Sequence, residues 1–161
     1  MSQKILDALK ARFSDKIIET HSSHGDETAI IEPGALLDIV RFLRDESSMA
    51  MNMLIDATAV DWQREEPRFE MVYHFYSIAN RHRVRLKTRI GTFEQEPEIA
   101  SLTSLYLGAN WLEREAFDLY GIKFIGHPEL KRILTYEGFE GHPLRKDYPI
   151  NKRQPLIGPK S

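Results

Sequence analysis

Apolar side chains near the N-terminus follow a helical repeat, in which every third or fourth residue is apolar: Ile5, Leu6, Leu9 and Phe13. This repeat predicts an amphipathic helix over residues 3–13 that covers one face of a sheet. Short apolar runs at 17–18 and 28–31 predict two strands joined by a polar loop. Pro33 suits the first turn of a second helix, whose core side is lined by Leu36, Leu37, Val40 and Leu43.

The middle of the chain reads as strands in antiparallel succession, over 54–62, 69–78 and 83–90. The run 69–78 is apolar on both faces, so we expect it to lie at the centre of the sheet. The run 83–90 alternates instead. Its apolar residues Val84, Leu86 and Ile90 face the core, while its outer face is entirely basic, with Arg83, Arg85, Lys87 and Arg89. Pro97 is then expected to open a helix that ends at Gly108.

The C-terminal part is organised around a helix predicted over 111–120. Asn110 can cap its N-terminus with Glu113 at the third helical position, and Gly121 stands where the helix should stop. Its apolar residues extend around most of the cylinder, so we expect burial on several sides: Trp111, Leu112, Ala116, Phe117, Leu119 and Tyr120.

The charges on this helix require partners from elsewhere. Arg114 and Asp118 stand four residues apart and can pair, but Glu113 and Glu115 have no basic residue three or four positions away. A desolvated carboxylate without a partner costs several kcal/mol. We therefore predict that Glu113 or Glu115 meets a cation of another chain or one of the downstream residues Lys131, Arg132, Arg145 and Lys146.

Beyond residue 122, paired Gly and Pro residues around His127 and His142 exclude a long helix or a central strand. A long segment without regular structure is normally functional or bound to something, and this one is too apolar for free disorder. The sequence thus predicts an α+β domain over 1–122, with a mostly antiparallel sheet covered by helices, and an extended arm over 123–161 that docks on partner subunits.

Composition excludes several classes of function. The chain has no cysteine, so it cannot supply a thiolate to an iron–sulfur cluster, a disulfide or a cysteine nucleophile. A formal net charge of −2 gives no overall attraction to nucleic acid or anionic lipid. No apolar run approaches the length of a membrane span, and the N-terminus lacks a signal core. We expect a cytosolic chain that reaches a membrane only through partners.

Two rival functions compete with a structural role. Glu113, Glu115 and Asp118 beside His127 contain groups suited to acid–base catalysis, but a structural ion-pair network is simpler. The basic strand beside Tyr73 and Tyr76 offers an RNA-binding sheet, which the overall charge and the missing aromatic-rich motif disfavour. His21 and His24 are assigned to a solvated turn, and Asp56 and Asp61 to polar contacts at a sheet edge. We predict no catalytic, cofactor or metal site.

A run of charged and apolar residues at fixed spacing comprises Glu113, Arg114, Glu115, Asp118, Leu119, Tyr120, His127, Lys131, Ile133 and Leu134. It resembles the signature of the C-type, or 30 kDa-type, subunit of proton-pumping NADH:quinone oxidoreductase, respiratory complex I. The stretch 139–149 is similar to the second block of that family, and the strand pair at 71–90 resembles its middle region. The resemblance covers roughly residues 54–149.

The resemblance implies a hydrophilic scaffold subunit of the peripheral arm, on the cytoplasmic face of the inner (plasma) membrane. Its implied partners are the hydrogenase-like large subunit of the D type, the small iron–sulfur subunit of the B type and the iron–sulfur subunit of the I type. FMN, Fe–S clusters and quinone would belong to the assembled complex and none to this chain, which would be inactive alone. The same signature occurs in ferredoxin-dependent quinone oxidoreductases and membrane-bound hydrogenases, so the electron donor stays open.

The expected structural or subunit-interface residues gather around the last helix and the arm: Glu113, Arg114, Glu115, Asp118, His127, Lys131, Arg132, His142, Arg145, Lys146, Asp147 and Tyr148. His127 and His142 each stand between Gly and Pro, so they are expected to anchor the arm by hydrogen bonds and not to bind a metal. Whether the basic face of strand 83–90 meets a partner or solvent is left open.

Overall fold

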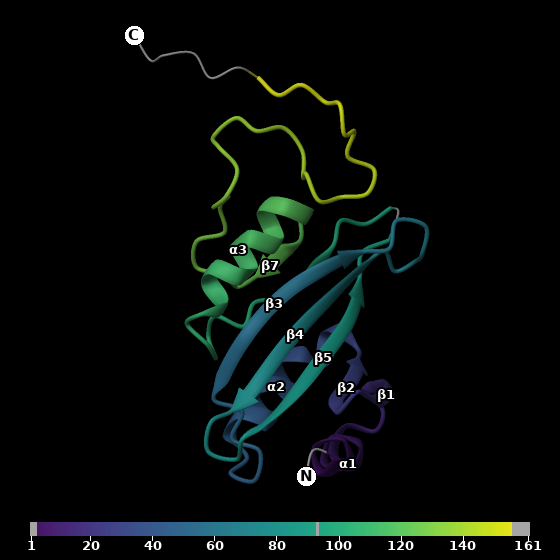
Figure 1. Cartoon of the computed structure of the whole chain (residues 1–161), viewed down its shortest axis with the longest axis vertical. Helices are drawn as coiled ribbons and strands as arrows, with labels where there is room; N and C mark the ends of the chain where they lie inside the picture. The colour runs from purple at the N-terminus through teal and green to yellow at the C-terminus, as the bar shows by residue number, and fades with distance from the viewer. Residues whose placement is uncertain (1–2, 93, 156–161) are drawn as a thin grey trace.

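A computed structural model of the chain describes residues 3–92 and 94–155 and has an α+β fold (Figure 1). The strands of its main sheet are β1 (Ile17–Ser23), β2 (Asp26–Ile31), β3 (Met53–Asp61), β4 (Phe69–Ser77) and β5 (His82–Ile90). They lie in the order β1-β2-β5-β4-β3, and every neighbouring pair is antiparallel except β2 with β5. The predicted class, α+β with a mostly antiparallel sheet, is confirmed.

Two N-terminal helices pack on one face of this sheet, α1 (Gln3–Phe13) and α2 (Leu36–Asp45), the latter after a 3₁₀ turn η1 (Pro33–Ala35). The predicted helices at 3–13 and after Pro33 are confirmed. Between them and the sheet lies the core, whose fully buried side chains include Leu9, Leu36, Ile39, Leu43, Tyr73 and Phe75. No described helix lies over the opposite face of β3, β4 and β5, which is turned to the viewer in Figure 1.

The predicted inner and outer faces of the strands are confirmed. Strand β4 is buried over Phe69–Tyr73, as expected for a central strand, and Val84 and Leu86 of β5 lie in the core. The basic residues of β5 point to the other face, where they pair with acids of neighbouring strands and loops. Arg85 meets Asp26, Lys87 meets Glu70, and Arg89 meets Glu65.

The helix predicted to run from Pro97 to Gly108 is wrong. This segment contains a short strand, β6 (Glu98–Ala100), which pairs in parallel with β7 (Lys123–Ile125) in a separate two-stranded sheet. The next two backbone N–H groups also find hydrogen-bond acceptors in later parts of the chain. Ser101 N–H donates to the carbonyl of Ile125, and Leu102 N–H donates to the carboxylate of Glu113. Partners distant in sequence therefore replace the hydrogen bonds that a helix would have made.

The last helix, α3, spans Ala109–Tyr120 and lies beside β3 (Figure 1). Its predicted C-terminal stop is confirmed, since Gly121 has a left-handed φ of 74° and donates its N–H to Phe117 O. The predicted N-cap is wrong: Gly108 takes that position without a side-chain cap, and Asn110 lies inside the helix. The capping box fails because Glu113 turns away from the helix N-terminus toward Ser101 and Leu102.

Candidate functional site

The candidate site is the α3–arm junction, where the segment we call the arm, residues 126–155, meets the C-terminal end of α3. In Figure 1 this segment runs over the end of α3 in yellow-green and yellow. It contains no helix or strand among its described residues, and Lys123–Ile125, which the sequence assigned to it, form β7. Its backbone is held instead by hydrogen bonds to side chains and helix ends.

Asp118 is the centre of the junction, with a side chain that is fully buried. One carboxylate oxygen accepts the backbone N–H groups of Ile133, Leu134 and Thr135 at 3.0, 2.8 and 2.8 Å. The other accepts Arg132 Nη1 at 2.8 Å and the hydroxyl of Thr135. Burial alone would raise the pKa of Asp118, but the hydrogen bonds from Thr135, Leu134 and Ile133 outweigh it and lower the pKa to about 2.

The arm also satisfies the last carbonyl groups of α3, which have no partner inside the helix. His142 donates from Nδ1 to Asp118 O at 2.9 Å, Leu144 N–H donates to Leu119 O at 3.1 Å, and Arg145 Nε donates to Tyr120 O at 2.6 Å. A cation at the C-terminus of a helix is also favoured by the helix dipole. Three consecutive carbonyls of α3 are therefore capped by side chains or backbone of the arm.

Gly121 makes this capping possible because it has no side chain. A Cβ at this position would lie 2.5 Å from Arg145 Nη2 and 2.5 Å from His142 Nε2. Both side chains thus pass directly over the glycine at the end of α3. His142 also packs its ring edge against Phe117, with ring centroids 6.5 Å apart.

A second anchor joins the arm to the ends of β3 and β4. Buried Asp61 accepts Arg68 Nε at 2.8 Å, Arg68 Nη2 at 2.7 Å and the backbone N–H of Lys146 at 2.7 Å, and Arg68 also pairs with Asp147 at 2.9 Å. Desolvation opposes ionisation of Asp61, yet the bonds from Arg68, Lys146 and Gln63 lower its pKa to about 2. The predicted sheet-edge contact of Asp61 is confirmed, and it reaches into the arm.

The remaining arm residues that the sequence predicted as structural or interface residues contact groups other than Asp118 and Asp61. His127 hydrogen-bonds Asn110 O through Nε2 at 3.1 Å and accepts Glu129 N–H at Nδ1 at 3.0 Å. Exposed Lys131 pairs with Glu129 at 2.6 Å. Tyr148 stacks on Phe139 with ring centroids 6.1 Å apart, so the arm also packs against itself.

No ion pair joins Glu113 or Glu115 to a cation within the described residues, so the intrachain part of that prediction is wrong. Glu113 is fully buried and accepts the Ser101 hydroxyl and Leu102 N–H, both at 2.6 Å. Glu115 is exposed. The Arg114–Asp118 pair is also absent there, because Arg114 donates to the carbonyls of Lys131 and Arg132 instead.

Burial raises the pKa of Glu113 to about 7, and the two hydrogen bonds from Ser101 and Leu102 only partly oppose this rise. Because the folded-state pKa lies above the ordinary value of 4.5, the folded chain binds a proton more tightly than the unfolded chain. The stability that this proton contributes is complete below about pH 4.5 and is lost as the pH rises through about 7.

We therefore expect Glu113→Gln to flatten the pH dependence of stability in this range. The rise from 4.5 to about 7 corresponds to roughly 3 kcal/mol of stability that wild type loses and the neutral amide does not. Urea unfolding at half-unit steps from pH 4.5 to 8 measures the difference. Glu115→Gln, on the exposed side of the same helix, is the matched control and should follow wild type. Parallel curves for wild type and Glu113→Gln would contradict the raised pKa.

The geometry does not assemble an acid–base site. Buried Glu113 faces Ser101, whereas His127 is engaged with Asn110 and Glu129, so the two are not brought together. Among residues 3–92 and 94–155, no group of three or more His, Cys, Asp or Glu side chains is placed to hold a metal ion. The RNA-binding alternative loses one of its two expected stacking residues, because Tyr73 is fully buried in the core, whereas Tyr76 is half-buried.

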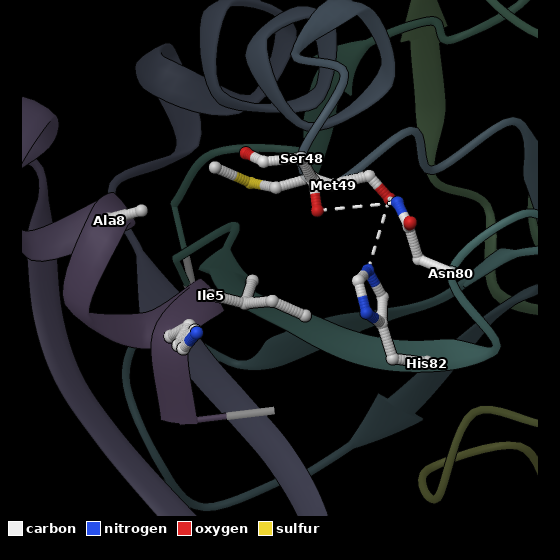
Figure 2. Close-up of a pocket in the computed structure, with 7 residues that line it drawn as sticks. Ile5, Ala8, Ser48, Met49, Asn80 and His82 are labelled. Atoms are coloured by element: carbon white, nitrogen blue, oxygen red, sulfur yellow. Dashed lines mark hydrogen bonds between the residues drawn. The ribbon is translucent and has the colours of Figure 1, made fainter. Parts of the chain in front are cut away.

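A cavity of ≈ 290 Å³ lies away from the junction, between α1 and the loops that follow α2 and β4 (Figure 2). Figure 2 shows Asn80 and His82 directed at the backbone of Met49, and both hydrogen-bond its carbonyl, at 3.2 and 3.0 Å. Ile5 and Ala8 close the apolar side. These polar groups are engaged in holding the loop, so we assign the cavity no chemistry.

The sequence did not predict the role of Arg68 in the Asp61–Arg68–Asp147 network, nor the contact of Ser101 with Glu113. The first has a signal in the sequence, because a hairpin between β3 and β4 sets Asp61 opposite Phe69 and so brings Arg68 alongside. Ser101 has none, since its role depends on Glu113, twelve residues further along.

Comparisons with known proteins agree with one another. A sequence profile of the family described as "Respiratory-chain NADH dehydrogenase, 30 Kd subunit" matches residues 29–154. The second C-type subunit of NADH-quinone oxidoreductase from Rhizobium etli is 45% identical over 148 residues, which is 92% of this chain and 78% of that protein.

Two solved structures have a similar fold. The trypsin-resistant fragment of Nqo5 has a TM-score of 0.68 at 24% identity, over 80% of this chain and 98% of the fragment. A chain of the archaeal membrane-bound sulfane sulfur reductase, a respiratory membrane complex, has a TM-score of 0.76 at 20% identity, over 93% of this chain and 86% of that chain. At these identities, the two structures establish the fold alone. Among the helices of residues 3–92 and 94–155, none combines the length and the hydrophobicity of a transmembrane segment.

Proposed function

The chain belongs to the family of the 30 kDa subunit of respiratory-chain NADH dehydrogenase, and we propose that it is the C-type scaffold subunit of a proton-pumping NADH:quinone oxidoreductase. The complex would transfer electrons from NADH through FMN and Fe–S centres to quinone. The observation that carries a scaffold role is the α3–arm junction. The buried carboxylates of Asp118 and Asp61 hold the arm in place by hydrogen bonds, because the arm has no helix or strand of its own among the described residues.

This chain lacks the residues that would bind an iron–sulfur cluster, so we assign it no step of electron transfer. The chain has no cysteine to supply a thiolate, and its described part holds no His, Asp and Glu group placed for a metal. We therefore assign the Fe–S clusters to other subunits, and we propose that FMN and quinone are bound there as well. The contribution of this chain is shape and assembly.

We propose further that residues 123–161 dock across the hydrogenase-like large subunit, near the small iron–sulfur subunit and the iron–sulfur subunit of the I type. The two anchors fix one side of the arm to the domain over 1–122, which leaves its other side to a partner. The arm also carries apolar residues that are exposed to solvent: Leu134, Leu144 and Ile150. The charged residues Lys131 and Lys146 are exposed beside them. Such an attachment would hold the chain on the cytoplasmic face of the membrane through its partners.

Deletion of the gene from its host tests the proposal. We expect membranes of the deletion strain to lose NADH-dependent quinone reduction and to regain it when the gene is supplied in trans, because the complex does not assemble without its scaffold. Reduced ferredoxin, offered in place of NADH to wild-type membranes, distinguishes the ferredoxin-dependent alternative. The purified chain alone should oxidise no NADH and show no visible chromophore. Unchanged activity in the deletion strain would contradict the proposal.

A further inference from the structure

Helix α3 has two opposite faces with different surroundings. Ala109, Glu113 and Ala116 are buried against the domain. Trp111 and Glu115 stand four residues apart, so they lie in line on the opposite side, and Leu107 precedes them in the turn before the helix. Leu107 is 91% exposed and Trp111 69% exposed, whereas the sequence pattern predicted burial of the helix on several sides. That prediction holds toward the C-terminal end of the helix, where Asp118 is buried on this opposite side, and fails at Trp111.

The arm covers only the C-terminal end of this outer side. Asp118, three residues beyond Glu115, is buried beneath residues 132–135, and Arg114 reaches the carbonyls of the same segment at 3.1 and 3.3 Å. Leu134 lies in the covering segment, where its N–H donates to Asp118, and is 62% exposed, so it adds an apolar side chain over the C-terminal end of the helix. We call the surface formed by Leu107, Trp111, Glu115 and Leu134 the α3 ridge.

The α3 ridge carries a negative charge that its surroundings do not pair. Glu115 is exposed and makes no ion pair among the described residues. The cations of α3 and of the start of the covering segment are engaged elsewhere, since Arg114 donates to the carbonyls of the arm and Lys131 Nζ lies 2.6 Å from Glu129. The ridge thus combines apolar side chains with one acidic group and no free cation among the described residues.

We propose that the α3 ridge is a docking surface for a neighbouring subunit of the oxidoreductase, which receives Trp111 in an apolar pocket and places a Lys or Arg against Glu115. This inference rests on the proposed function. Exposed apolar surfaces with polar borders mark protein interfaces, and tryptophan is enriched among the residues that dominate binding energy.

Charge complementarity selects a different subunit over a second copy of this chain. A two-fold contact would bring the same surface of both copies together, and the described residues of the ridge offer no cation to meet the Glu115 of its mate. A phosphate-bearing partner such as RNA is disfavoured by the same carboxylate. An apolar surface with a basic residue at its edge satisfies both Trp111 and Glu115.

The test compares tagged variants expressed in the host in place of the wild-type chain, purified from detergent-solubilised membranes with the recovered subunits identified and quantified. We expect Trp111→Ala and Glu115→Arg each to lower the recovery of the other oxidoreductase subunits at least about tenfold. Both residues are exposed, so the purified variants should unfold at the wild-type urea concentration. Trp62→Ala, on the open sheet face, and Glu46→Arg, exposed after α2, are the matched controls and should recover the subunits as wild type does.

The possible results distinguish a failure of the proposed function from a failure of the α3 ridge as a docking surface. If the wild-type chain recovers no oxidoreductase subunits, the proposed function itself fails. If wild type recovers them and both ridge variants recover them equally well, the α3 ridge is not a docking surface. If light scattering shows that the free chain is a dimer and Trp111→Ala makes it a monomer, the occupant is a second copy and the proposal is overturned.

Discussion

Replacing Gly121 with Ala is expected to destabilise the chain by about 3–6 kcal/mol and to release the arm from α3. The φ of 74° costs a residue with a side chain roughly 1–2 kcal/mol. The new Cβ would lie 2.5 Å from both Arg145 Nη2 and His142 Nε2, so both side chains must move. Their hydrogen bonds to the carbonyls of Tyr120 and Asp118 are then lost, at about 1–2 kcal/mol each.

Urea unfolding gives the change in stability, and trypsin cleavage within the arm reports its release. Gly108→Ala is the matched control at the other end of α3, because its φ of −63° suits any residue and nothing lies within 4 Å of an added Cβ. It should be neutral or slightly stabilising, since alanine has less freedom in the unfolded chain. Equal stability of the two variants would contradict the close packing of Arg145 and His142 over Gly121.

Replacing Asp118 with Ala is expected to cost roughly 3–5 kcal/mol at neutral pH, the cost of breaking a buried ion pair. The change leaves Arg132 without its carboxylate and three backbone N–H groups of the arm without an acceptor. Thr135→Val removes one hydroxyl, which donates to the same carboxylate and accepts Arg132 Nη1 at 3.1 Å, so it is the milder control and should cost about 1–2 kcal/mol.

The stability that Asp118→Ala loses should be largest at neutral pH and should shrink as the pH falls. The folded-state pKa of Asp118, about 2, lies below its ordinary value of 3.8, so the carboxylate stabilises the fold fully above about pH 4. That contribution disappears as the pH falls through about 2. Urea unfolding of wild type and Asp118→Ala should therefore differ most at neutral pH and converge in acid. A constant difference down to pH 2 would mean that the carboxylate acts by packing alone.

Patterns within a few residues predicted most of the fold. The apolar repeats of α1 and α2, the alternation of β5 and the stop at Gly121 depend on neighbours three, four or two positions away, which the sequence displays directly. The segment 97–108 failed because its course is decided by Ile125 and Glu113, which lie in later elements. Proline and glycine at its ends are equally compatible with a strand and turns.

The sequence predicted which residues belong to the site, but it did not predict which of them contact one another. Asp118, Arg132, His142 and Arg145 were expected to be structural or interface residues, and they do meet at the end of α3. Their partners could not be predicted, because each contact joins residues that are 14 to 25 positions apart across a segment without periodic structure. Trp111 shows the opposite difficulty. Its apolar character is evident in the sequence, but the sequence alone does not tell the core of the chain from the surface of a partner.

We claim that this chain is a scaffold subunit of an NADH:quinone oxidoreductase, and purification of the tagged wild-type chain from detergent-solubilised membranes of its host is the decisive experiment. We predict that the other subunits of that enzyme are recovered with it in equal amounts, and that the eluate reduces quinone with NADH. Recovery of the chain alone, or with the subunits of a ferredoxin-dependent or hydrogenase complex in place of an NADH-oxidising one, would contradict the claim.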